Sequence, residues 1–231
     1  MVCVIVFLVA VVFVVAVSVR IEHIDVTGCV YQSKDDVIIR SNLMYGMNMF
    51  LINYEKVKTH INSDPYFVFR DMKYDYYKRT VYLDIYERLP MCVINTLGVQ
   101  CTLDVMGVVL GKTEDISNPN QLIELMGLRT RDVAVGQTIN ADNKQQLIAY
   151  LLMAYEINAL GCSSILTQMN VLEPANLYIE LANGMSVRLG NAEHMHAKIL
   201  SLLTVLDTLS NMGLTGGMID VSNPVFPVYI P

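Results

Sequence analysis

The sequence has no tryptophan, few charged residues and no run of basic residues. Only 16% of the 231 residues are Asp, Glu, Lys or Arg, and the formal net charge is −6. A nucleic-acid-binding surface needs clustered Lys and Arg side chains, because phosphate contacts supply much of the affinity. The composition therefore argues against a nucleic-acid partner.

Motifs that would indicate catalysis or a cofactor are also missing. The sequence has neither a G-x-x-x-x-G-K-[ST] phosphate loop nor a G-x-S-x-G nucleophile turn. His194 and His196 point to different faces of a helix, and no Cys or carboxylate cluster completes a zinc site with His23 or His60. We predict a non-enzymatic protein without cofactor, metal or small-molecule substrate. An exported enzyme with an unrecognised site is the alternative.

The sequence has only five cysteines, and none of them has C-x-x-C spacing. Four lie beyond the N-terminal apolar run: Cys29, Cys92, Cys101 and Cys162. Four cysteines allow three disulfide connectivities, and an exported chain permits disulfides. A domain of this size does not need them to fold, so small buried apolar side chains are the favoured interpretation.

Residues 1–19 contain no charge, proline or glycine. A membrane-spanning helix needs about 20 apolar residues, with a range of roughly 17–25, and we predict a transmembrane helix here. A cleavable signal peptide is one alternative, but the run exceeds the usual h-region and lacks a basic n-region. A buried strand, the other alternative, would not normally run this long. Arg20 alone would keep the body cytoplasmic by the positive-inside rule.

Residues 21–88 show the pattern strand, helix, helix, strand, strand. Alternation predicts a strand over 21–26, and Ser33 and Asn53 can cap two helices that follow them. Two strands are predicted over 68–76 and 80–87. This order predicts a small α+β layer with both helices on one face of the sheet.

Residues 89–231 combine strands with two long helices. Helices are predicted over 142–160 and 198–212, each followed by glycine. Short apolar segments bounded by turn residues predict the strands, and Asn183-Gly184 indicates a hairpin. The predicted strands lie at 91–95, 100–103, 108–110, 164–170, 177–181, 186–189 and 218–221. Residues 111–121 are predicted as a loop, and Pro224, Pro227 and Pro231 break the C-terminal end.

Eight local strings, in order along the chain, resemble the FtsQ/DivIB family of bacterial cell-division proteins. Each string is weak alone, but their order over nearly the whole chain is specific. They are Ile24-Asp25-Val26-Thr27-Gly28, Gly46-Met47-Asn48-Met49-Phe50, Asp64-Pro65-Tyr66-Phe67-Val68, Ile85-Tyr86-Glu87-Arg88-Leu89-Pro90, Leu103 to Leu110, Asn183-Gly184 with Leu189-Gly190, Lys198, and Ile219-Asp220-Val221-Ser222-Asn223-Pro224.

The resemblance implies a POTRA domain over residues 21–88 and an FtsQ-type β domain over 89–231. It implies a single-pass protein of the cytoplasmic membrane at the division septum, with its N-terminus cytoplasmic and its body outside. It also implies a non-enzymatic scaffold that binds FtsB/DivIC-like and FtsL-like partners.

In the family the final strand offers an edge to the FtsB-like partner, and a partner can add a strand to such an edge. The matching partner-binding residues here are Met218, Ile219, Asp220, Val221 and Ser222. The alternative is a POTRA-containing protein of an outer-membrane transport or assembly system. Such proteins carry many alternating segments of about ten residues, and residues 89–231 have too few.

Overall fold

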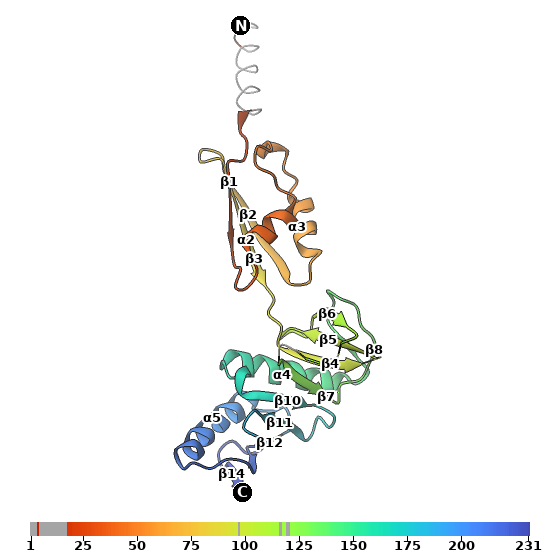
Figure 1. The fold of residues 1–231 in the computed structure, drawn as a ribbon, viewed down its shortest axis with the longest axis vertical. Coiled ribbons are helices and arrows are strands. Elements are labelled where there is room, and N and C mark those ends of the chain that lie inside the picture. Colours follow the sequence, from red (N-terminus) through yellow and green to blue (C-terminus); the bar gives the residue numbers. More distant parts are fainter. Residues whose placement is uncertain (1–3, 5–17, 97, 116, 119–120) are drawn as a thin grey trace. The chain divides into compact units, whose positions relative to one another are not determined.

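The computed structural model describes Val4 and residues 18–96, 98–115, 117–118 and 121–231. The chain divides into two compact units, one ending at Arg88 and the other beginning at Leu89, and each is described by itself (Figure 1). The predicted transmembrane helix over residues 1–19 lies almost entirely outside the described residues. Within those described ranges, no helix has the length and hydropathy needed to cross a bilayer.

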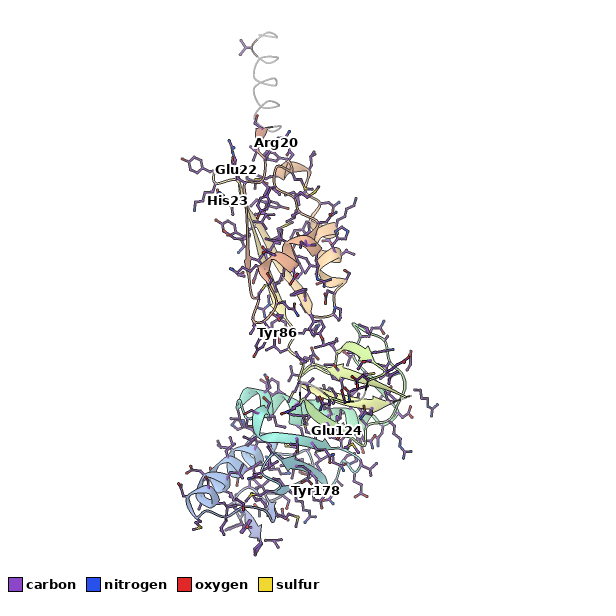
Figure 2. All side chains as sticks on the ribbon, viewed as in Figure 1. Arg20, Glu22, His23, Tyr86, Glu124 and Tyr178 are labelled. Atoms are coloured by element: carbon purple, nitrogen blue, oxygen red, sulfur yellow. The ribbon has the colours of Figure 1, made fainter. Side chains whose placement is uncertain are left out.

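The first unit has the predicted β-α-α-β-β order, with both helices on one face of a three-stranded sheet (Figure 1). Strand β3 lies in the middle, parallel to β1 and antiparallel to β2. Arg20 and Tyr86 mark opposite ends of the unit (Figure 2). The elements are β1 (His23–Thr27), α2 (Lys34–Ser41), η1 (Met49–Leu51), α3 (Tyr54–Asn62), β2 (Phe67–Asp75) and β3 (Thr80–Glu87).

Capping side chains begin both helices of the first unit where the sequence predicts them. Ser33 accepts a hydrogen bond from the backbone N–H of Asp35 at 3.2 Å. Asn53 accepts one from the backbone N–H of Lys56 at 3.0 Å. Such caps satisfy N–H groups that have no partner within the helix.

A buried carboxylate fastens the loop before α2 to the end of β3. Glu87 is only 3% exposed, and it accepts hydrogen bonds from the backbone N–H groups of Val30, Tyr31 and Gln32 at 2.5, 3.0 and 3.1 Å. Hydrogen bonds to a charged acceptor are stronger than neutral ones. Glu87 is therefore a structural residue of this unit.

The second unit is built on a nine-stranded mixed sheet with the order β14-β13-β12-β11-β10-β7-β4-β5-β6. A separate pair, β8 and β9, forms a small ribbon. The sheet strands are β4 (Cys92–Thr96), β5 (Val99–Leu103), β6 (Val109–Thr113), β7 (Ile123–Met126), β10 (Leu166–Asn170), β11 (Leu177–Leu181), β12 (Ser186–Gly190), β13 (Met218–Asp220) and β14 (Val228–Ile230); the ribbon is β8 (Thr130–Asp132) and β9 (Asn140–Ala141).

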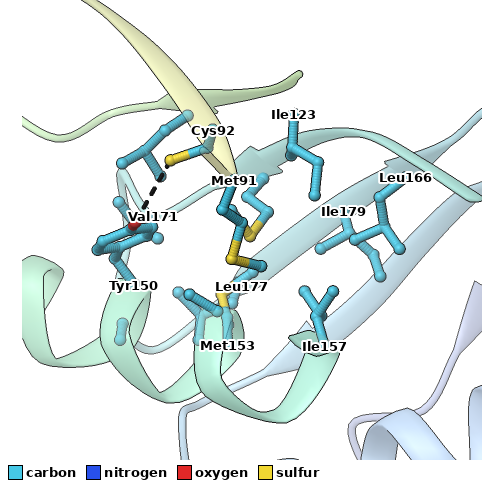
Figure 3. Close-up of a cluster of buried hydrophobic side chains, with 14 of the residues drawn as sticks. Met91, Cys92, Ile123, Tyr150, Met153, Ile157, Leu166, Val171, Leu177 and Ile179 are labelled. Atoms are coloured by element: carbon cyan, nitrogen blue, oxygen red, sulfur yellow. Dashed lines mark hydrogen bonds between the residues drawn. The ribbon is translucent and has the colours of Figure 1, made fainter. Parts of the chain in front are cut away.

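Two helices, α4 (Lys144–Ala159) and α5 (Met195–Asn211), share one apolar core with this sheet. Figure 3 shows Tyr150 of α4 beside Cys92, with Met153 and Ile157 facing strand residues. The Tyr150 hydroxyl donates to the backbone carbonyl of Asp104 at 2.6 Å, which satisfies the polar end of a fully buried ring. The sheet and the two helices therefore form two layers that pack around one core.

The four cysteines within the described ranges are free, and three of them, Cys92, Cys101 and Cys162, are buried. Burial raises the pKa of the Cys92 thiol to about 12, outweighing the hydrogen bond to Tyr150. A thiol with such a pKa is not a nucleophile at neutral pH.

Several strand predictions were incomplete. The predicted helices 142–160 and 198–212 are confirmed as α4 and α5, within a few residues. In contrast, β7, β8, β9 and β14 were not predicted, and β6 extends to Thr113, inside the predicted loop 111–121. The four missed strands are two to four residues long, too short to show a hydrophobic period.

Candidate partner-binding surface

The C-terminal end of the nine-stranded sheet is formed by β12, β13 and β14. Strand β13 runs parallel to β12, with Ile219 opposite Val187. On its other side β13 pairs antiparallel with β14, where Ile219 lies opposite Tyr229. Because both sides of β13 are paired, its backbone offers no free edge.

The prediction that residues 218–222 form a free edge of the sheet is therefore wrong. Met218, Ile219 and Asp220 form β13, inside the sheet. Val221 is fully buried, and its backbone N–H donates to the carbonyl of Arg188 at 2.9 Å. The Ser222 backbone N–H donates to the carboxylate of Asp220 at 2.8 Å.

The outermost strand at this end is β14, which follows the turn containing Pro224 and Pro227. From the sequence, these prolines were expected to end the regular structure. They instead reverse the chain, so that Val228-Tyr229-Ile230 pairs with β13. A run of β-branched and aromatic residues has strand propensity, and this run is the sequence signal from which β14 could have been predicted.

The two edges of the nine-stranded sheet differ in protection. Strand β6 is covered by the segment 133–139, where the Gly136 backbone N–H donates to the carbonyl of Val109 at 2.8 Å. Lys112 of β6 also donates from Nζ to the carbonyl of Val133. Strand β14 ends the sheet, and within the described residues no further strand pairs with it. Natural proteins usually cover or charge such edges.

The surface around β14 is apolar. Val228 and Ile230 are about half exposed, and Val225 and Phe226 in the preceding turn are each 73% exposed. Tyr229 points the other way, toward the core, and its hydroxyl donates to the carbonyl of Gly216 at 3.1 Å. We call β14 with the turn 224–227 the C-terminal edge.

A shallow groove runs between helix α5 and the C-terminal edge. Its walls are aliphatic or small and carry no charge. They are formed by Ala197, Leu200, Ser201, Thr204, Val205, Pro224, Val225 and Pro227.

Polar contacts order the sheet face next to the C-terminal edge. Arg188 of β12 pairs with Asp220 of β13, with Nη1 and Oδ2 3.1 Å apart. Its Nε also donates to Asn176 at 2.9 Å. Burial acts to raise the pKa of Asp220, but the hydrogen bonds from Ser222 and the contact with Arg188 outweigh it, so this pKa lies below its usual value.

The start of α5 is held by a buried lysine. Lys198 is 2% exposed, and its ammonium donates to the backbone carbonyl and the side-chain oxygen of Asn191 at 2.8 and 3.0 Å. Burial lowers the pKa of Lys198, while the charges of Glu193 and Asp220 oppose this shift. Lys198 therefore fixes the helix that forms one wall of the groove.

The histidines do not assemble a metal site in the structure. His196 of α5 contacts Glu156 of α4, with Nδ1 and Oε2 2.8 Å apart. Within the described residues, no three His, Cys, Asp or Glu side chains lie close enough together to hold a metal ion. The His196–Glu156 contact joins the two helices that cover the sheet.

Comparison with known proteins agrees with this architecture. Residues 19–67 match the model of the FtsQ-type POTRA domain. The cell division protein DivIB of Clostridium acetobutylicum is 25% identical over 210 residues, covering 91% of this chain and 82% of the relative. DivIB of Clostridium tetani is 24% identical over 196 residues, covering 83% of this chain and 73% of the relative. These matches confirm the resemblance inferred from the sequence: the chain carries an FtsQ-type POTRA domain and is, over most of its length, a distant homologue of the DivIB cell-division proteins.

Proposed function

We propose that this chain is a non-enzymatic scaffold of the bacterial division machinery that binds partner proteins at the C-terminal edge. The observation that carries the proposal is β14, an apolar strand at the end of a nine-stranded sheet whose other edge is covered. A strand at such an edge has backbone groups available to a partner strand. The distant homology to DivIB proteins supports a role in division.

Partner binding at β14 requires more than the strand itself. Pro227 and Pro231 flank three residues, and a proline has no N–H to donate to a ladder. A short ladder gives little affinity alone, so we propose that the partner also places an apolar side chain in the groove beside Leu200 and Val225. The proposed partners are FtsB/DivIC-like and FtsL-like ectodomains.

The proposal assigns separate tasks to the two units. Residues 21–88 are proposed to act as the POTRA domain, and residues 89–231 as the partner-binding β domain. The uncharged residues 1–19 would anchor the chain in the cytoplasmic membrane. The N-terminus would then be cytoplasmic, and both units would lie outside at the division septum.

Substitution at the C-terminal edge tests this proposal. We expect Val228→Lys to weaken binding of an FtsB/DivIC-type ectodomain by at least about tenfold, or ~1.4 kcal/mol. The added charge would have to be desolvated, and lysine on an edge opposes strand addition. The measurement is a titration of the full chain in detergent with the labelled ectodomain.

Val135→Lys is the matched control. Val135 is 47% exposed, against 54% for Val228, but it lies in the segment that covers the opposite edge. The Val135→Lys variant should bind the ectodomain as tightly as the unchanged chain does. Equal affinities for the Val228→Lys variant and the unchanged chain would contradict strand addition at β14.

A further inference from the structure

The end of the first unit that contains Arg20, Glu22 and His23, labelled in Figure 2, carries several exposed aromatic and apolar side chains. They come from the loop before α3 and from the β2–β3 hairpin, and each is at least 44% exposed. We call this set the Arg20-end patch; its members are Met44, Tyr45, Phe50, Leu51, Tyr76 and Tyr77. A cluster of this kind usually marks an interaction site.

Ring stacking joins the two segments of the patch. Phe50 stacks on Tyr76 with ring centroids 4.8 Å apart, and Tyr76 stacks on Tyr74 at 5.9 Å. The hairpin is also fixed to the start of the unit, because the Glu22 backbone N–H donates to the carbonyl of Arg79 at 2.9 Å. These contacts therefore join the two segments that carry the patch and hold them in place.

The backbone holds the exit of the N-terminal apolar run against the same surface. The Met49 N–H donates to the carbonyl of Val19 at 3.0 Å, and the Gly46 N–H donates to that of Ile21 at 2.8 Å. Arg20 adds a bond from Nη1 to the carbonyl of Gly46 at 2.9 Å. Val19, the last residue of the run, is thus hydrogen-bonded to the residue that precedes Phe50 of the patch.

We propose that the Arg20-end patch rests in the headgroup layer of the phospholipid bilayer that anchors the chain. This inference rests on the proposed anchor in residues 1–19. If the anchor ends at Val19, no linker separates it from the first unit, because the Val19 carbonyl accepts a hydrogen bond from the Met49 N–H. Tyrosine is enriched at membrane interfaces, where its ring meets the acyl boundary and its hydroxyl stays hydrated.

We expect the charges of this end to contribute little to the contact. Arg79 pairs with Glu22, and Lys78 Nζ lies 3.8 Å from Asp75 Oδ2, so two of its cations have acidic partners. Attraction by anionic lipid would be screened by salt. The contact should therefore come from aromatic and apolar burial, and it should persist at high salt.

The absence of tryptophan from the chain makes a direct test possible. Tyr77→Trp places a single tryptophan in the patch, on a side chain that is 96% exposed. The full chain is reconstituted in phosphatidylglycerol–phosphatidylethanolamine vesicles whose acyl chains carry bromine, which quenches nearby tryptophan. We expect blue-shifted emission and loss of most of its intensity, in low and high salt.

Tyr31→Trp is the matched control, because Tyr31 is 81% exposed and lies near Glu87, at the opposite end of the unit. Its emission should remain that of a hydrated, unquenched tryptophan. Equal quenching of the two variants would overturn the inference. So would a Tyr77→Trp emission that is unquenched, or blue-shifted without quenching, in chains that float with the vesicles.

Chains that fail to float with the vesicles would overturn the anchor and this inference together. That outcome would leave the proposed partner binding intact, because the titration of the Val228→Lys variant is performed in detergent.

Discussion

Replacing Gly217 with alanine should displace β14 and lower the affinity for an FtsB/DivIC-type ectodomain by at least about tenfold. Gly217 has a φ of +86°, and an added Cβ would lie 2.5 Å from the carbonyl oxygen of Ile230. It would also lie 3.0 Å from the Tyr229 ring. The neighbouring strand must then move away, because a backbone atom cannot yield as a flexible side chain can.

Gly216→Ala controls for the conformational cost of the same substitution. Gly216 has a φ of +82°, but an added Cβ would meet no atom within 4 Å. The Gly216→Ala substitution should lower the free energy of unfolding by about 1 kcal/mol and leave the affinity for the ectodomain unchanged. If both variants bind the ectodomain as tightly as the unchanged chain, β14 is not the docking strand.

Replacing Gly28 with alanine should destabilise the first unit by about 3 kcal/mol or more, from backbone strain and steric overlap together. Gly28 has a φ of +96°, and its Cβ would lie 1.8 Å from the carbonyl oxygen of Ile85 in the central strand. The loop that follows cannot shift freely, because Glu87 binds three of its backbone N–H groups. Hydrogen exchange of β1 and β3 amides in the full chain measures the loss.

Gly46→Ala is the corresponding control in the same unit. Gly46 has a φ of +82° and free space where the Cβ would lie, so the expected loss is about 1 kcal/mol. Equal losses of stability for the Gly28→Ala and Gly46→Ala variants would mean that overlap with Ile85 adds nothing to the cost of a side chain at Gly28.

The parts of the fold that the sequence predicted are those specified by local chemistry. Ser33 and Asn53 begin helices because their side chains bond to backbone N–H groups two or three residues ahead. The alternation of Val81, Leu83 and Ile85 identifies β3, because one face of the strand is buried. The family resemblance was recognisable because its strings follow these elements in order.

The C-terminal edge could not be predicted in the same way. Whether β13 or β14 ends the sheet depends on a chain reversal through Pro224 and Pro227, and local propensity does not specify the pairing that follows. The apolar groove is also tertiary, because it joins α5 to a turn about twenty residues later. The sequence therefore identified the C-terminal end of the sheet, but it placed the free edge on β13 instead of β14.

Hydrogen exchange of the full chain with and without an FtsB/DivIC-type ectodomain tests strand addition most directly. A partner strand would occupy the outward-facing backbone groups of β14, so amide exchange within Val228–Ile230 should slow when the ectodomain is added. The prolines at 227 and 231 have no amide, which isolates this three-residue signal. Slowed exchange elsewhere, with the β14 amides exchanging as in the free chain, would contradict the proposed partner-binding surface.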